Sequence, residues 1–410
     1  MASTAEPATR SPAAVPGSLL PYLPCGARSV RGPDCSPSAP QEAGPSASHR
    51  SREPTAATTQ HQRLTVLYPC RRCVYQRRWW EHTIFAGHRV LCHEAATAED
   101  VRAAEVVVAS FVNPKRSADG WELQKTLLDR LGLSGRALVG KVLVHLDDEY
   151  GARTPRVPAD WVTYCSLYAG WRHVFRNYWS QSWSSMVGRR HAMNCSKLVD
   201  TTAAFNPKVE WTPLGWSSNW EPGRPWRPTS RRALSVGFYG NEKYQLRPNR
   251  ATLIARFERE AGAVVDGRML GRVGFGRGNA SEYVRLMHDT GLCLQISGLS
   301  AECYRMYEAL DSGCVPLLIN EYGNPSSPSA AVQYQFLVGR YGRAPFPFVH
   351  GPAELREWLA RARVDPAALD SVQVATMRWW NQSLARLRAR VVEHGRAVWG
   401  GDGDGQSPQR

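Results

Sequence analysis

The chain has 410 residues, of which 51 are Lys or Arg and 36 are Asp or Glu, so its formal net charge at pH 7 is +15. Hydrophobic residues make up 43% and charged residues 21%, which is typical of globular proteins and excludes a wholly disordered chain. This length corresponds to roughly two or three domains. The positive charge favours an anionic partner, such as a nucleic acid, a phosphorylated ligand or an acidic glycan, without choosing among them.

Both ends of the chain have the composition of disordered segments. Residues 1–60 are rich in Ala, Pro, Ser and Thr, residues 400–410 are rich in Gly, and neither shows a helical or strand period. The leader lacks the apolar core of a secretory signal peptide. Elsewhere no uninterrupted apolar run approaches the roughly 18 residues that a membrane helix needs. We therefore expect no signal or membrane-spanning segment in this sequence.

Residues 61–228 contain a first series of apolar runs. Four of them are typical of strands and lie at 63–68, 104–112, 141–146 and 173–179. Residues 120–132 have the apolar spacing of a helix that ends on glycine. The stretch 211–230 is rich in Pro and Trp and is interpreted as a linker or hinge. Eight of the 15 Trp fall between Trp161 and Trp226, where they serve either core packing or stacking on sugar rings or bases.

A second series begins after this stretch. It predicts strands at 232–240, 291–297 and 315–319 and helices at 248–262, at 300–313 and twice within 352–398. Strands that alternate with helices indicate parallel sheets built from right-handed crossover units. We therefore expect an α/β protein with two facing Rossmann-like domains, each with a parallel sheet, and a cleft between them. The expected domains are 61–228 and 229–350, followed by C-terminal helices at 351–399.

The segment 291–319 is the most informative part of the chain. It reads as a strand, a Gly-containing turn, a helix and a second strand, with Ser300 at the N-cap and Gly313 just after the helix. Ligands of parallel sheets bind beyond the carboxyl ends of the strands, and a helix N-terminus there suits a diphosphate. Arg305 supplies a cation, and Glu308 is able to accept hydrogen bonds from both hydroxyls of a ribose. The alternative is that these two residues form an exposed ion pair.

The same segment resembles a known family. SAECYRMYEALDSGCVPLLI (300–319) is similar to the C-terminal signature of exostosin-type glycosyltransferases, and SEYVRLMHDTGLCL (281–294) is similar to the approach to that signature. HLDDE, VFRNYW, PLGW and FYGN with a following Arg resemble the divergent branch that includes the ribitol xylosyltransferases. The sequence departs from the family at 295–298, where QISG replaces the usual Cys-Pro-x-Gly turn and keeps Gly298.

This resemblance implies a GT-B fold with the nucleotide-sugar in the C-terminal domain and the acceptor toward the N-terminal one. It implies that Glu308 binds the donor ribose and that Arg305, Ser300 and the turn at Gly298 bind the diphosphate. Directly after the first strand of the C-terminal domain, Gly240 and Asn241 are expected to form the other wall of the donor pocket. Arg247 and Arg250 are further candidates for phosphate or an anionic acceptor; the alternatives are a tight turn for Gly240 and surface solvation for the arginines.

Substrates and location also follow from the resemblance. It implies a nucleoside-diphosphate sugar, a UDP-sugar first, as co-substrate, with no bound metal required and no other cofactor. The acceptor is expected to be a glycan, a glycoprotein or a polyol, and no nucleic acid is expected as a partner. Family members usually sit in the Golgi or another secretory lumen behind an N-terminal membrane anchor, and this sequence shows none.

An acidic cluster is the source of candidates for the catalytic base. KVLVHLDDEY places His145, Asp148 and Glu149 at the carboxyl end of the strand 141–146, and inverting glycosyl transfer needs one base for the acceptor hydroxyl. Asp148 or Glu149 is the first choice, and a solvated acidic loop is the alternative. Two other function classes remain open: a non-catalytic protein that binds nucleic acid or acidic glycan through its charge and Trp faces, and an inactive GT-B domain.

CRRC at 70–73, with His82, His88 and Cys92, is a weak candidate for a zinc site. A Cys₂His₂ finger has about 12 residues between its Cys and His pairs, whereas eight separate Cys73 from His82. Disulfides or thiols are therefore favoured over a metal site. Ten cysteines in total leave the redox compartment open.

Overall fold

The computed structural model describes residues 63–68, 77–111, 141–147, 171–177, 209–217, 220–239, 280–296, 303–319, 344–349 and 351–396, with short helical pieces between 252 and 259. All of them belong to one unit of the chain, Thr59–Arg410. The expected helix at 120–132 and the two expected disordered ends lie outside the described residues.

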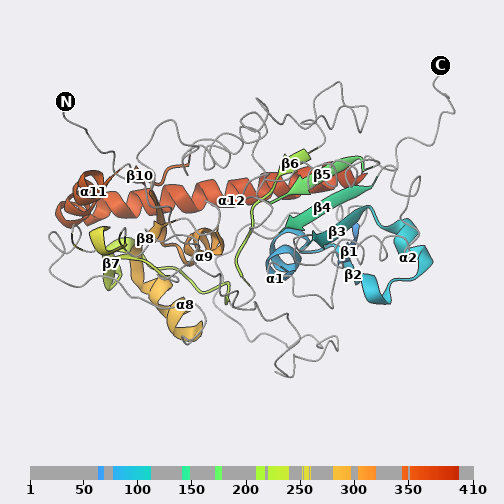
Figure 1. The fold of residues 1–410 in the computed structure, drawn as a ribbon, viewed down its shortest axis with the longest axis horizontal. Helices are drawn as coiled ribbons and strands as arrows, with labels where there is room; N and C mark the ends of the chain where they lie inside the picture. Colours follow the sequence, from blue (N-terminus) through green and yellow to red (C-terminus); the bar gives the residue numbers. More distant parts are fainter. Residues whose placement is uncertain are drawn as a thin grey trace, which may run out of the picture. The chain divides into compact units, whose positions relative to one another are not determined.

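Six parallel strands form the first sheet, in the spatial order β2-β1-β3-β4-β5-β6 (Figure 1). They are β1 (Thr65–Tyr68), β2 (Arg89–Cys92), β3 (Val106–Phe111), β4 (Val142–Asp147), β5 (His173–Arg176) and β6 (Val209–Trp211). The sequence does not predict the short strands β2 and β6, whereas the other four confirm the expected apolar runs.

The middle of this sheet is buried on both faces. Consecutive residues of a strand point to opposite faces, yet Val66 and Leu67 in β1 are both fully buried, as are Val107 and Val108 in β3. A parallel sheet covered on both sides requires such continuous apolar strands. This is why the strands read as unbroken Val and Leu runs in the sequence.

Short helices connect the first strands. They are α1 (Arg77–Trp79), a π-helical turn (Trp80–Ile84), a 3₁₀ turn (His93–Ala95) and α2 (Ala98–Ala103). The start of α2 is a capping box, because Thr97 Oγ1 accepts from the amide of Asp100 at 3.1 Å and the Asp100 carboxylate accepts from the amide of Thr97 at 3.0 Å.

The second sheet has four parallel strands in the order β10-β9-β8-β7. The strands are β7 (Leu234–Gly237), β8 (Thr290–Gln295), β9 (Val315–Ile319) and β10 (Phe348–Val349), and α8 (Ala280–Asp289) and α9 (Tyr304–Ser312) lie between them in sequence. Two parallel sheets in one chain confirm the expected α/β class with two Rossmann-like sheets.

Helix α9 begins later than the sequence indicates. Its N-cap is Cys303, with extended backbone angles of φ −147° and ψ 156°, so the expectation of Ser300 as N-cap is wrong. Cys303 is buried beside β8, with its Sγ 4.0 Å from Oε1 of Gln295. The end of the helix is as expected, because Gly313 adopts the left-handed conformation with φ +71°. Because Cys303 is the N-cap and α9 starts at Tyr304, Arg305 lies in the first turn of the helix.

The described part of the chain ends with two helices, α11 (Pro352–Val364) and α12 (Pro366–Arg396), which confirm the two helical patterns expected within 352–398. Asp365 caps the start of α12 from the position just before it, since its carboxylate accepts from the amide of Ala368 at 3.1 Å. Gln373 of α12 donates to the carbonyl of Gly313 at 2.6 Å, and Arg390 donates to Glu210 of β6 at 2.8 Å. Helix α12 therefore holds both the end of α9 and an edge of the first sheet.

No helix among the described residues combines the length and the apolar character needed to cross a bilayer. Even α12, the longest of them, carries several Arg residues along its exposed face.

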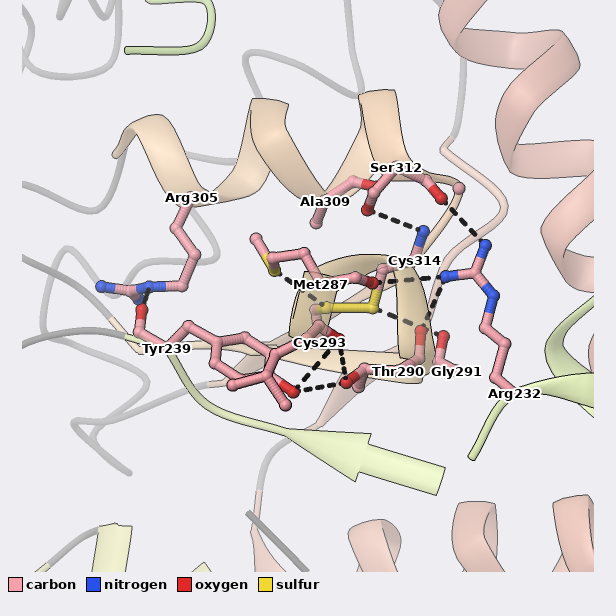
Figure 2. Close-up of a disulfide and its surroundings, with 12 residues drawn as sticks. Arg232, Tyr239, Met287, Thr290, Gly291, Cys293, Arg305, Ala309, Ser312 and Cys314 are labelled. Atoms are coloured by element: carbon pink, nitrogen blue, oxygen red, sulfur yellow. Dashed lines mark hydrogen bonds between the residues drawn. A yellow bond between two sulfur atoms is a disulfide. The ribbon is translucent and has the colours of Figure 1, made fainter. Parts of the chain in front are cut away.

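A disulfide joins the two central strands of the second sheet (Figure 2). It links Cys293 of β8 to Cys314, the residue before β9, with Cα atoms 5.9 Å apart. Cys92 is also disulfide-bonded and therefore supplies no thiolate for a zinc site. His88, another residue of that weak candidate, accepts from the amide of Leu64 through Nδ1 at 3.2 Å. Both observations agree with the preference for disulfides over a metal near CRRC.

The glycine that ends α9 generates a stability prediction. A Cβ on Gly313 would lie 2.6 Å from Cβ of Trp226, in addition to the strain of a positive φ. We expect Gly313→Ala to lower the free energy of unfolding by about 2–3 kcal/mol in urea titrations. The matched control is Gly223→Ala, which has φ +84° and nothing within 4 Å, and which isolates the strain at about 1 kcal/mol. Equal losses in both variants would contradict the steric argument.

Candidate functional site

The carboxyl edge of the second sheet holds a buried arginine. Arg305 is 8% exposed; its Nε donates to the carbonyl of Tyr239, just after β7, and its Nη1 donates to the carbonyl of Ile296, just after β8, at 3.0 Å. In Figure 2 the side chain leaves α9 and turns toward Tyr239. Because both carbonyls follow parallel strands, the guanidinium lies at the edge where ligands of such sheets bind.

The surroundings of Arg305 hold its side chain in place. The guanidinium carbon lies 4.5 Å from the centre of the Phe238 ring, a cation–π contact. Its Nη2 makes no hydrogen bond to any residue that the structure describes. Since Arg305 also belongs to the first turn of α9, the fixed cation and the positive end of the helix dipole lie together. This combination suits a phosphate or diphosphate.

Glu308, one turn further along α9, is fully buried. Its Oε1 accepts from the backbone amide of Ser217 at 3.1 Å and from Oγ of Ser217 at 2.7 Å. Its Oε2 accepts from the hydroxyl of Tyr283 in α8. The carboxylate therefore ties together α8, α9 and the segment that follows β6. The alternative of an exposed ion pair between Arg305 and Glu308 is wrong, because both side chains are buried and each has other partners.

These contacts limit what Glu308 offers to a ligand. A carboxylate has about four lone-pair positions, and Ser217 and Tyr283 already use three of them. Burial and the adjacent Glu308 carboxylate raise the pKa of Tyr283 well above its usual range, so the phenol stays protonated and keeps donating. A ribose hydroxyl at Glu308 must therefore take the remaining position or replace one of these donors.

A second acid on α9 extends the network. Asp311 accepts from the indole of Trp220 at 2.6 Å, and burial raises the pKa of this carboxyl. The Trp220 ring stacks on His288 of α8 with centroids 5.8 Å apart, and burial together with Arg232 lowers the pKa of His288 to about 4. Residues 212–217 and Trp220 are buried, and within this half of the expected linker or hinge Ser217 and Trp220 contact α8 and α9.

The other ends of α8 and α9 meet at Arg232. Its guanidinium donates to the carbonyls of Thr290 at 2.8 Å and Ser312 at 2.9 Å, and to that of Met287 at 3.4 Å (Figure 2). A cation at helix C-termini satisfies the last carbonyls and the negative end of each dipole. Burial lowers the pKa of Arg232 to about 10, which still leaves it charged at neutral pH.

Of the three base candidates, the structure describes His145. It lies in β4 and is fully buried, and burial with the nearby Arg176 lowers its pKa well below the usual range. A fully buried imidazole presents no surface to an acceptor hydroxyl. Eight other predicted site residues lie outside the described residues: Asp148, Glu149, Ser300, Gly298, Gly240, Asn241, Arg247 and Arg250.

Sequence reasoning missed Ser217, Tyr283 and Arg232. Tyr283 is 25 residues from Glu308 and Ser217 is 91 residues away, so no local spacing indicates the contact. The one available signal is that both lie in or beside the segments that resemble the family, Ser217 directly after PLGW and Tyr283 within SEYVRLM.

A parallel sheet with a buried arginine and a helix N-terminus at its carboxyl edge defines an α/β domain, and the arrangement suits an anionic ligand. Residues 268–395 match the family described as RXYLT1 C-terminal domain. These 128 of the 410 residues include α8 and α9, and with them the site residues Tyr283, Arg305 and Glu308. The match confirms the resemblance to the ribitol xylosyltransferase branch of the exostosin-like glycosyltransferases for this part of the chain.

Comparison with solved structures finds glucosyltransferases. An alpha-glucosyltransferase in complex with UDP-glucose and DNA containing an abasic site is 12% identical, with 80% of this chain and 98% of that chain covered and a TM-score of 0.46. The T4 phage beta-glucosyltransferase is also 12% identical, with 81% and 96% covered and a TM-score of 0.35. Comparison with curated protein sequences finds no significant match.

The buried carboxylate generates a second prediction. We expect Tyr283→Phe to lower the free energy of unfolding by about 2–3 kcal/mol, because it removes a hydrogen bond to a buried charge. The control is Tyr239→Phe, whose hydroxyl bonds only neutral groups, Thr290 Oγ1 and the carbonyl of Leu286, with an expected loss of about 1 kcal/mol. Urea titrations measure both, and a loss for Tyr283→Phe no larger than that of the control would refute the charged bond.

Proposed function

We propose that this protein is a glycosyltransferase that moves a sugar from a nucleoside-diphosphate donor to a hydroxyl of a glycan, glycoprotein or polyol acceptor. The observation that carries the proposal is Arg305, fixed by two backbone carbonyls in the first turn of α9 within the part of the chain that matches the RXYLT1 C-terminal domain. A UDP-sugar is the proposed donor, as the family resemblance implies.

The proposed chemistry follows from charge. When the sugar leaves, negative charge develops on the diphosphate, and a preorganised cation beside a helix N-terminus stabilises that charge without reorganising. Arg305 and α9 supply both, so the proposal requires no bound metal or other cofactor. Ser300, Gly298, Gly240, Asn241, Arg247 and Arg250 are proposed to complete the donor pocket.

Inversion at the anomeric carbon needs one base for the acceptor hydroxyl. The burial of His145 leaves Asp148 or Glu149, directly after β4, as the proposed base. The carboxyl end of a parallel strand is a suitable place for such a group.

We also propose a secretory compartment such as the Golgi lumen. Cys293, Cys314 and Cys92 are disulfide-bonded, and disulfides of this kind persist in oxidising compartments rather than in the cytosol. The family resemblance points to the same compartment.

One observation favours a second candidate, an inactive GT-B domain. Glu308, the proposed ribose ligand, is fully buried and already bonded to Ser217 and Tyr283. If Ser217 and Tyr283 keep these hydrogen bonds when a nucleotide is present, Glu308 does not bind the ribose, although the fold is intact. A test of ribose recognition therefore separates the two candidates.

Arg305 is tested through the diphosphate. We expect UDP to bind the wild type at least about tenfold more tightly than uridine, and Arg305→Lys to lose most of this ratio, since lysine lacks the fork that bonds carbonyls and phosphate together. Isothermal titration calorimetry gives both affinities, and their ratio is insensitive to partial loss of folded protein. Arg285→Lys, an exposed arginine on α8, is the control and keeps the ratio. An unchanged ratio in Arg305→Lys would remove Arg305 from the site.

Glu308 is tested through the sugar of the nucleotide. We expect the wild type to prefer UDP over 2′-deoxy-UDP by about tenfold or more, as for one hydrogen bond to a charged group, and Glu308→Gln to lose the preference. Asp311→Asn is the matched control, because Asp311 is also a carboxylate of α9, is partly buried, and bonds Trp220. UDP binding without any 2′-hydroxyl preference in the wild type would favour the inactive domain.

A further inference from the structure

Three side chains with the chemistry of metal ligands meet away from α9. They are His173 of β5, Glu210 of β6 and His394 in the last turn of α12. Each offers one ligand atom, and these atoms all lie within 4.8 Å of one another. None of the three is part of the proposed donor site, and their positions in the sequence are so far apart that only the fold brings them together.

Two of the three polar side chains in this cluster are buried, which is uncommon for side chains of this kind. His173 is 3% exposed and Glu210 is 2% exposed. His173 Nε2 lies 3.2 Å from Oε2 of Glu210 without the alignment of a hydrogen bond, and the buried Nε2 of His394 has no hydrogen-bond partner among the described residues. A buried polar nitrogen without a hydrogen-bond partner costs about 1–3 kcal/mol of stability. A bound ligand that contacts both nitrogens and the carboxylate would remove this cost.

The two imidazole rings lie against each other beside the carboxylate. His173 and His394 stack with centroids 3.7 Å apart and planes 10° apart. The cluster therefore brings two imidazole nitrogens and one carboxylate together, and these are donor groups that zinc binds in proteins. Arg390 adds a positive charge on one side of Glu210, bonded at 2.8 Å, and pairs with Glu393 at 3.1 Å.

We propose that His173, Glu210 and His394 bind a divalent metal ion of the zinc class. Two imidazole nitrogens and one carboxylate are a common zinc ligand set, with water or another ligand in the fourth position. A metal lies near the plane of each ligating ring, so binding turns His394, the most exposed of the three, out of its stack on His173. Arg390 holds one carboxylate oxygen of Glu210 as an outer partner.

The role of such an ion is structural. β5 and β6 form an edge of the first sheet, and His394 is on α12, whose Gln373 also bonds Gly313 at the end of α9. A metal at the cluster would fasten the last turn of α12 to this sheet edge. The proposed sugar transfer uses none of the three metal ligands, so a negative result for the metal leaves the proposed glycosyltransferase function untouched.

Metal content tests the site directly. The full chain is stripped with EDTA, equilibrated with Zn²⁺, dialysed and analysed by inductively coupled plasma mass spectrometry. We expect about one zinc per wild-type chain and a loss of that zinc in His394→Ala, since a site left with two ligands binds weakly. The matched control is His288→Ala, a half-buried stacked histidine of α8 outside the cluster, which keeps its zinc. Wild type without zinc, or equal zinc in His394→Ala, overturns the proposal.

A measurement on the wild type alone covers the case in which His394→Ala does not fold. Zn²⁺ binding to the folded state raises the melting temperature by mass action, and Co²⁺ in a site with nitrogen and oxygen ligands gives visible d–d absorption bands. We expect both effects, with Zn²⁺ displacing the Co²⁺ bands. A melting temperature that Zn²⁺ leaves unchanged, or a featureless Co²⁺ spectrum, overturns the site without reference to any variant.

Discussion

The buried carboxylate of Glu308 needs hydrogen-bond donors, and this need links the helices of the second sheet to the segment after β6. A fully buried charge is tolerated only when hydrogen bonds replace its lost water, because the uncompensated cost is several kcal/mol. Ser217 and Tyr283 supply those bonds from two other segments. The requirement therefore fixes α8, α9 and the chain after β6 relative to one another, and it places the first turn of α9 beside the carboxyl ends of β7 and β8.

The ends of α9 show how one short helix is held at both termini by charge and backbone geometry. At its start, Arg305 reaches back to the carbonyls after β7 and β8. At its end, Arg232 takes the carbonyl of Ser312 and Gln373 takes that of Gly313. The disulfide between Cys293 and Cys314 adds a covalent link between the strands on either side of the helix in sequence. A site built on elements held this firmly presents a preorganised cation, which is what stabilisation of a leaving diphosphate requires.

The Glu308 carboxylate is needed both for the stability of the fold and for the proposed contact with a ribose. Bonds from Ser217 and Tyr283 stabilise the buried Glu308, yet they occupy the oxygen atoms that a ribose would need. Arg305 shows less conflict, because its Nε and Nη1 bond the protein while Nη2 bonds none of the described residues. The cation is thus better suited to a ligand than the carboxylate in the geometry described.

Local pattern in the sequence is enough for the elements of the fold and for part of the site. Apolar runs predict β1, β3, β4, β5, β7, β8 and β9. Turn chemistry predicts the end of α9 at Gly313, because burial on both faces and a left-handed glycine leave direct marks on residue type. Helical spacing and family resemblance single out Arg305 and Glu308. Their burial and partners do not follow from the sequence, nor does the N-cap of α9 at Cys303, whose side chain lies beside Gln295 of β8.

What the tertiary structure alone decided are the contacts between residues distant in sequence. No spacing rule joins Ser217 to Glu308, Arg232 to the ends of two helices, or His173 and Glu210 to His394. The physical reason is that periodicity reports which face of an element is buried, whereas the identity of the partner depends on how separate elements pack. The sequence by itself determined the α/β class, the parallel strands and the residues of α9 that carry charge; only the folded chain determined which polar groups those charges meet.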